Sequence, residues 1–382
     1  MSNAIVRKHA NAREAPIKDR GFMGWVRSNL FSTWYHSIIT VLLFWVVGNI
    51  VFFLFEWGVL NAVWVGESAK ACPNLEGACW AFITDRWQLI VYGLVPKQLH
   101  WRINLFYLLA IATAIVFIFS FGKQDKKIRI IFFIAFPIIG YFLLRGGSFG
   151  LQSVEPDKWG GLVLTLVVAS CGIFGAIPLG LLLALGRYSN LPILKRVCAG
   201  FIEFWRGVPL IVVIVTFVAL LPIFIPDGAK IDIVIRTLIA FAVFNSAYMA
   251  EVFRGGLQSI DSGQFEASKS IGLSYWQMMG YIILPQAIRN SVPALVNTCI
   301  SVFKETTLIL LIGFSDLLGI IHISLEDPIW LGPPHIFASA YTFVAIVFFL
   351  FCYGMSRYSR RLENRSNISP VSYTHLTLPT KA

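Results

Sequence analysis

The chain contains repeated apolar stretches close to the length that crosses a lipid bilayer. An α-helix needs about 20 residues to span the hydrocarbon core, and there only helices and closed barrels satisfy every backbone hydrogen bond. Stretches of this length favour helices. The sequence therefore predicts an all-α integral membrane protein with about eight transmembrane helices, at residues 38–55, 104–121, 128–144, 161–185, 210–224, 233–250, 285–302 and 336–353.

The composition agrees with a membrane protein. Hydrophobic residues make up 57% of the chain and charged residues only 13%, whereas soluble domains carry roughly a quarter charged residues. The net charge of +11 is also typical of nucleic-acid-binding proteins. Here, however, the basic residues are dispersed among the connections between apolar stretches, which is the pattern of cytoplasmic loops retained by the positive-inside rule. We therefore expect contact with the lipid membrane and none with nucleic acid.

Charge and hydropathy together divide the chain into four parts. Residues 1–34 are polar and basic, lack the pattern of a signal peptide, and are predicted to form a cytoplasmic tail. Residues 35–159 form an N-terminal transmembrane region whose three helices act as scaffold, and residues 160–360 form a second region with five helices. Residues 361–382 form a second cytoplasmic tail. From about Val371 the sequence changes character, and we interpret these last residues as non-native.

A long connection follows the first apolar stretch and carries two cysteines, Cys72 and Cys79. With the N-terminus inside, this loop lies outside in an oxidising compartment, where the two thiols can form a disulfide that braces the loop. Two unpaired thiols are the alternative. The other cysteines are single, and no metal-ligand spacing occurs.

The stretch 161–185 is rich in small residues, including Gly172, Gly175 and Gly180. Small residues allow helices to approach closely in lipid. Two interpretations stay open: close packing within one subunit, or a moving helix along a transport pathway.

Residues 251–285 differ from both neighbouring stretches because they are polar and punctuated by glycine. Their length suits two short helices joined by a turn at Gly272. A polar hairpin of this kind lies in water, where it can contact a soluble partner. An ordinary amphipathic loop is the alternative.

The spacing E-A-(A/S)-x3-G-x9-I-x-L-P in this segment resembles the coupling loop of the membrane subunits of bacterial ABC importers. The matching residues are Glu266, Ala267, Ser268, Gly272, Ile282, Leu284 and Pro285. Ser268 stands where the family often has alanine. The E-F-x-R-G-x-P-L pattern from Glu203 and the tract 245–256 resemble the polar-amino-acid branch. The resemblance implies a five-helix type I permease core at 160–360, and the added N-terminal helices resemble the larger, M-type subunit of general L-amino-acid transporters.

Two further groups of residues follow from these motifs. Glu203 and Arg206 are close to one helical turn apart and are predicted to pair at the cytoplasmic interface. Lys304, Glu305, Thr306 and Thr307 are similar to the family's K-(D/E)-T-(S/T)-L. In a straight helix Lys304 lies roughly 28 Å from Pro285. The group is either an interfacial charged cap or the polar end of a broken helix that lines the substrate route.

The resemblance implies a non-catalytic subunit in the bacterial inner membrane with both termini in the cytoplasm. The sequence has no phosphate-binding loop and no catalytic motif, so no cofactor is expected in this chain and ATP and Mg are expected on a partner ATPase. The other implied partners are a second permease subunit, homologous or identical, and a periplasmic amino-acid-binding protein. The rivals are a secondary transporter or channel not coupled to ATP, and a membrane-embedded enzyme.

Overall fold

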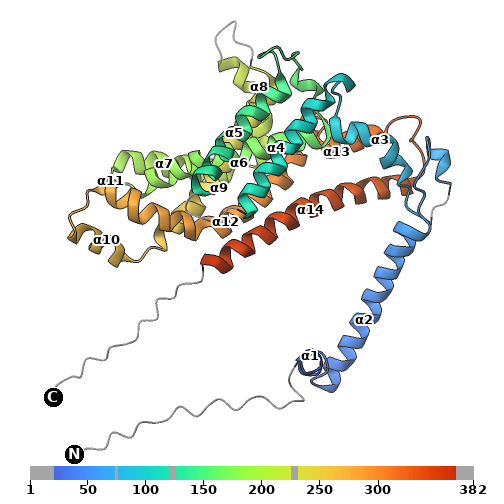
Figure 1. The fold of residues 1–382 in the computed structure, drawn as a ribbon, viewed down its shortest axis with the longest axis horizontal. Helices are drawn as coiled ribbons and strands as arrows, with labels where there is room; N and C mark the ends of the chain where they lie inside the picture. Colours follow the sequence, from blue (N-terminus) through green and yellow to red (C-terminus); the bar gives the residue numbers. More distant parts are fainter. Residues whose placement is uncertain (1–20, 74–75, 120–124, 225–230, 367–382) are drawn as a thin grey trace, which may run out of the picture.

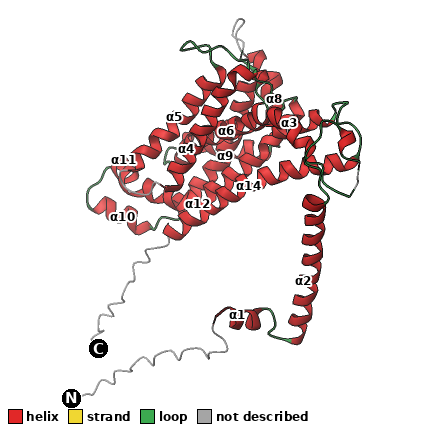
Figure 2. Ribbon diagram, turned by 45° about the vertical axis from the view of Figure 1, so that its right-hand side comes forward, coloured by secondary structure: helices red, strands yellow, loops and turns green. Residues whose placement is uncertain are grey.

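A computed structural model describes residues 21–73, 76–119, 125–224 and 231–366, which form helices joined by loops (Figure 2). Of the predicted tails 1–34 and 361–382, residues 1–20 and 367–382 lie outside the described residues, α1 lies within the first tail, and α14 continues into the second as far as Ser366. The helices are α1 (Gly21–Asn29), α2 (Trp34–Phe55), α3 (Ala81–Tyr92), α4 (His100–Phe119), α5 (Asp125–Arg145), α6 (Gly161–Tyr188), α7 (Pro192–Gly207), α8 (Leu210–Leu220), α9 (Ile233–Gln258), α10 (Ser262–Ser270), α11 (Tyr275–Gln277), α12 (Leu284–Glu305), α13 (Leu317–Leu325) and α14 (Pro334–Ser366).

Seven helical stretches within the described part of the chain are long and apolar enough to cross a membrane. The predicted all-α membrane fold is therefore confirmed. The expected span at 210–224 differs, because α8 and the 3₁₀ turn after it are too short to cross alone. With α7 they form a pair that passes the same test but is bent by 104°. Pro209 causes the break, since proline holds the residue before it, Val208, in an extended conformation.

The first two helices lie apart from the rest of the bundle (Figures 1 and 2). Most side chains of α2 are exposed, as expected for a helix that faces lipid. The corner between α1 and α2 is closed by the Thr40 hydroxyl, which donates a hydrogen bond of 2.7 Å to the carbonyl of Leu30. The helix begins at Trp34, four residues before the predicted start of this span.

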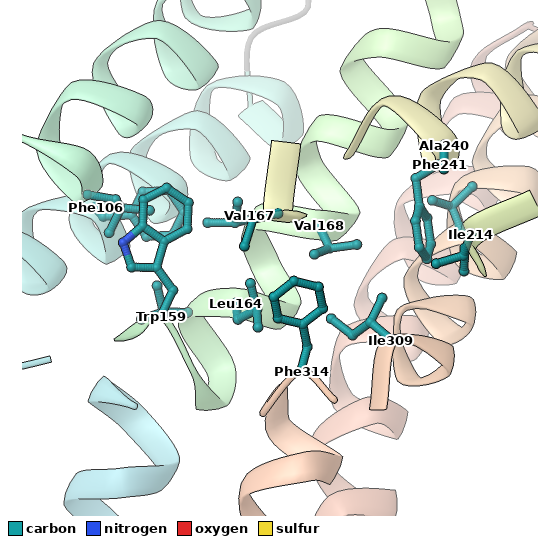
Figure 3. Close-up of a cluster of buried hydrophobic side chains, with 14 of the residues drawn as sticks. Phe106, Trp159, Leu164, Val167, Val168, Ile214, Ala240, Phe241, Ile309 and Phe314 are labelled. Carbon is teal, nitrogen blue, oxygen red and sulfur yellow. The ribbon is translucent and has the colours of Figure 1, made fainter. Parts of the chain in front are cut away.

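Close packing of α6 against α9 forms the centre of the bundle. A Cβ atom added at Gly175 would lie 2.8 Å from the Cβ of Ala242, and one added at Gly180 would lie 2.6 Å from the Cβ of Met249. The small residues of α6 therefore serve close packing within one chain. Apolar side chains continue this core toward α4, α8 and the segment after α12, as Figure 3 shows for Leu164, Val168, Phe241, Ile214 and Ile309.

The connection between α2 and α4 is not a simple loop, because it contains α3 and packs on α13 and α14. Cys72 and Cys79 form a disulfide with a Cα–Cα distance of 5.9 Å. The Cys79 amide donates to Ser339 Oγ at 2.7 Å, and the His335 ring lies 2.8 Å from the Cys72 carbonyl. We call residues 61–73, 76–92 and 313–333 together the distal cap, since they lie at the end of the bundle away from α10 (Figure 1).

Inside the distal cap, charged and aromatic side chains join α3 to the segment after α13. Arg86 Nη2 lies 2.6 Å from Asp327 Oδ2. The fully buried Trp330 donates its indole N–H to Asp85 at 2.8 Å and packs edge-on against Phe82. The cap is therefore a folded unit rather than a loop that only a disulfide holds.

A buried polar junction joins the beginning of α13 to the beginning of α6. Gly161, with φ of +60°, donates to the Ser315 carbonyl at 2.7 Å, and the Leu317 amide donates to Thr165 Oγ1 at 3.0 Å. The Asp316 side chain is fully buried, and one of its oxygens accepts from the Gly319 amide at 2.8 Å. Its other oxygen is buried without a partner. Burial therefore raises the pKa of Asp316 to about 6.

Asp316 should make stability depend on pH in a defined direction. Between about pH 4 and 6 the folded protein holds a proton on Asp316 that the unfolded chain has released, so stability should fall as pH rises through this range. Asp316→Asn keeps an oxygen to cap α13 and removes the titration. We expect its thermal melting midpoint in detergent to lose this pH dependence.

Asp327→Asn is the matched control, with the opposite sign. The Ile329 amide, more than the neighbouring Arg86, lowers the pKa of Asp327. The stability that the Asp327 carboxylate contributes is therefore present above the pKa of the unfolded chain and is lost as the pH falls through the folded pKa. Identical melting profiles for the wild type and Asp316→Asn would show that the buried carboxyl does not titrate as argued.

Candidate functional site

A polar hairpin joins α9 to α12 at the end of the bundle opposite the distal cap (Figure 1). Its first arm is α10, which Asp261 caps by accepting a hydrogen bond of 2.6 Å from the Gly263 amide. Its turn lies at Gly272, the predicted position, with φ of +80°. The Leu273 amide bonds the Ser268 carbonyl at 3.2 Å, which completes the helix ending that favours glycine at this position.

The second arm differs from the prediction because it continues into the membrane span without a break. It begins at α11 with a capping box between Ser274 and Gln277, passes through a π-helix at Met278–Ile283, and becomes α12. Pro285 was expected to start the span, but it lies in the first turn of α12, where a missing N–H is tolerated. Tyr275–Ile312 thus forms one candidate span.

The residues of the coupling-loop motif divide into an outward and an inward set. Glu266 and Ala267 are exposed. Ser268 is buried and donates its hydroxyl hydrogen to the Gln264 carbonyl. Ile282 and Leu284 are half-buried and pack on a small core, whereas Pro285 is exposed. That core is formed by Leu257, Met278, Met279, Ile283 and Ala287.

Large apolar side chains lie exposed around the turn of this hairpin. Ile271 is 71% exposed, Trp276 80% and Tyr281 78%. Exposed apolar groups that gather next to polar ones are typical of interaction surfaces. The outward side of the hairpin therefore has both the charge of Glu266 and apolar groups for contact with another molecule.

Polar contacts fix the hairpin to α12 at two levels. Gln286 donates to the Gln264 side chain at 3.2 Å, and Asn290 donates to the Ser259 hydroxyl at 2.9 Å. Two residues before α9 ends, Gly256 lies so close to α12 that an added Cβ would overlap the hydroxyl of Ser291. These contacts link α10 to α12 and the end of α9 to α12, so we expect a displacement of α10 to be passed on to both helices.

A cluster of charged side chains lies just before the hairpin, with Glu251 of α9 at its centre. Glu251 lies 2.8 Å from Arg187 of α6, 2.8 Å from Arg254 of α9 and 3.7 Å from Arg206 of α7. Its side chain is only 17% exposed. The carboxylate thus holds three arginines from three helices, and we call these four residues together with Glu203 the Glu251 cluster.

The predicted pair of Glu203 and Arg206 is wrong. Glu203 contacts Arg187 at 3.2 Å instead, and Arg206 contacts Glu251 and lies over the Tyr248 ring. A pair three residues apart on one helix contributes only a few tenths of a kcal/mol. The half-buried carboxylate of Glu251 is the stronger partner, and nothing local to Glu203 in the sequence reveals it.

Lys304, Glu305, Thr306 and Thr307 lie at the opposite end of α12, where the α-helix becomes a 3₁₀-helix at Thr306–Ile312. Lys304 is exposed, Thr306 is buried, and Glu305 Oε2 is buried without a partner. The 3₁₀-helix ends at Gly313, with φ of +88°. The helix type changes here, but Tyr275–Ile312 is still one candidate span. The interfacial cap and the broken helix along the substrate route both stay predictions.

One face of α12 is polar and exposed along most of its length. Asn290, Asn297, Ser301 and Lys304 are all exposed and follow one another at steps of seven, four and three residues, which places them on one side of a helix. We call them the α12 stripe. Polar residues within a span normally face protein or water rather than lipid. Among the described residues, no group of three or more His, Cys, Asp or Glu has the geometry of a metal site.

The helical membrane fold and the polar hairpin between α9 and α12 agree with the membrane component of a transport system. The chain belongs to the family of binding-protein-dependent transport system inner membrane components, which matches residues 176–367.

Two curated relatives match most of the chain. The inner membrane amino-acid ABC transporter permease protein YhdY of Escherichia coli (strain K12) is 44% identical over 345 residues, covering 90% of this chain and 93% of the relative. The glutamate/glutamine/aspartate/asparagine transport system permease protein BztC of Rhodobacter capsulatus is 33% identical, covering 92% and 95%. A solved amino acid ABC transporter with histidines is 32% identical over 54% of this chain and 92% of its own, with a TM-score of 0.48.

Loss of the central carboxylate should destabilise the protein more than loss of a peripheral one. Glu251→Gln removes the carboxylate that three guanidinium groups share in a half-buried place, and among the described residues only Arg187 keeps a second carboxylate, that of Glu203. We expect a loss of about 2 to 4 kcal/mol in the free energy of unfolding. Glu203→Gln is the matched control, because its side chain is 66% exposed and bonds the same Arg187; its loss should stay under about 1 kcal/mol. Thermal melting in detergent compares the two, and equal shifts would contradict a central role for Glu251.

Proposed function

We propose that this chain is the permease subunit of an ATP-driven amino-acid importer, that it forms part of the translocation pathway, and that it couples to a separate ATPase subunit through α10. Its family and the printed names of its relatives, amino-acid ABC transporter permeases, support this proposal. We propose that this chain has the role of the larger, M-type subunit of general L-amino-acid transporters, which its added N-terminal helices resemble. Hydrolysis of ATP, with its Mg, belongs to the partner ATPase and not to this chain.

The observation that carries the proposal is the outward side of a hairpin whose inward side is fixed to the bundle. Glu266 and Ala267 are free for contact with another molecule, while Ser268 packs inward. A secondary transporter or channel has no need of such a hairpin. A soluble ATPase that binds the hairpin can move the membrane helices to which the hairpin is attached.

Movement of α10 reaches the membrane helices by two routes. The first runs through Gln264 and Gln286 into α12, whose far end carries Lys304 about 30 Å away at 1.5 Å per residue. The second runs along α9 to Glu251 and from there to α6 and α7. Closure of the ATPase subunits would thus move α12 and α9 together and change which end of the pathway is open.

The α12 stripe supports a substrate pathway along α12 and a second permease subunit that covers it. Exposed amide and ammonium groups in hydrocarbon cost several kcal/mol. A second subunit, homologous or identical, would cover the stripe and leave a polar route between the two. In this arrangement α10 and both termini lie in the cytoplasm, and a periplasmic amino-acid-binding protein delivers its ligand at the distal cap.

Co-purification with the cognate ATPase tests the coupling. The double variant Glu266→Lys, Gly272→Pro reverses the exposed charge and imposes a proline where φ is +80°. We expect it to lose the ATPase by at least about tenfold, which corresponds to about 1.4 kcal/mol, and to lose ATP-dependent uptake of labelled amino acid. The membrane level of the variant protein should remain that of the wild type.

Glu326→Lys is the matched control, because it reverses an equally exposed charge in the distal cap. It should retain the ATPase. If the ATPase co-purifies with neither the wild type nor the control, uptake driven by an ion gradient becomes the better explanation. If the double variant retains it, the docking site lies elsewhere.

A further inference from the structure

A small cavity lies between the N-terminal region and the family core, at the end of the bundle away from α10. It has a volume of about 50 Å³, which is room for a few oxygen-sized atoms. Its walls come from α4, α5, the loop after α5, α6 and α9, and most of them are apolar, for example Phe106, Phe136, Val167 and Leu238. The cavity is also far from the hairpin, because Val234 in its wall lies about 36 Å along α9 from the end that joins α10, at 1.5 Å per residue.

Two hydrogen-bond donors in the wall of this cavity have no acceptor. The Nη1 atom of Arg145 and the Nε1 atom of Trp159 are both buried without a partner. Trp159 is only 4% exposed, and Figure 3 shows its ring nitrogen on the side of Phe106, another residue of the wall. A buried donor without an acceptor is energetically unfavourable, and a charged one more so, so both groups favour a bound acceptor.

A neighbouring arginine holds the backbone around both donors. Arg102 is 98% buried, and its guanidinium donates to the carbonyls of Leu143 at 2.6 Å, Gln152 at 2.7 Å and Leu144 at 3.3 Å. The Val154 amide also donates to the Arg145 carbonyl at 2.7 Å. Because Arg102 occupies these nearby carbonyls, the side chain of Arg145 is left to bind something else.

We propose that Arg145 and Trp159 bind an anionic oxygen, the phosphate group of a membrane phospholipid. The chemistry of the wall supports an anion, because it offers one cationic and one neutral donor and contains no Asp or Glu. Tyr141 supports lipid as the source, since it lines the cavity and is also 45% exposed on the outer face of α5, beside exposed Ile138. Arg145 ends α5 and so lies at the depth of the lipid headgroups.

Retention of lipid by the purified protein tests this site. Wild-type protein extracted in mild detergent should keep about one phospholipid, detected by native mass spectrometry. Trp159→Phe keeps the packing of the ring and removes its N–H, and Arg145→Gln removes the charge. Each should lower the retained fraction at least about fivefold while the thermal melting midpoint in lipid-free detergent changes little. Lys158→Gln is the control, because it removes an exposed charge next to Trp159 and should retain lipid like the wild type.

Addition of inorganic phosphate to delipidated protein distinguishes the two sources of the anion. Stabilisation by phosphate alone, lost in Arg145→Gln, without retained phospholipid, would overturn lipid as the ligand and leave a free-anion site. Equal lipid retention in the wild type, Arg145→Gln and Trp159→Phe would overturn the site altogether and assign the cavity to water. Neither result depends on whether α10 binds an ATPase.

Discussion

The contact between the backbones of α6 and α9 is the interaction on which the rest of the structure depends. In lipid, helices gain nothing by hiding apolar side chains from one another, so association rests on close van der Waals contact and a few polar links. Gly175 and Gly180 provide that contact because a larger residue at either position would collide with α9. Both ends of the pair then carry further elements. The distal cap joins the start of α6 through Gly161, and the hairpin of α10 follows the end of α9.

Local chemistry made the spans and the turn of the hairpin predictable. Apolar length sets a span, and glycine at a left-handed position sets a turn, so both can be inferred from a short window of sequence. Gly272 is the best example. The bend between α7 and α8 is less evident, because Pro209 predicts a break but not that the segment after it is too short to cross a bilayer by itself.

The sequence does not reveal contacts between residues that are far apart along the chain. Arg187 and Glu251 are 64 residues apart, so their pairing depends on how α6 lies against α9. The same reason explains the error over Glu203 and Arg206, whose spacing is right for a pair but whose neighbours in space are better partners. The docking of the cysteine-containing segment on α14 was equally hidden, although the two cysteines themselves suggested the disulfide.

The cysteine-containing loop of the distal cap is held by residues of α14 that lie far along the sequence, and this has a consequence for the order in which the protein is made. Cys72 and Cys79 are close in sequence, so their loop can close soon after it is synthesised. Its anchors, His335 and Ser339, are about 260 residues further along and belong to the last helix. The surface of α3 that packs on α14 therefore stays uncovered until α14 has been made and has entered the membrane. Completion of the cap is a late step of biogenesis, and an incomplete chain would expose this apolar surface to proteases and chaperones.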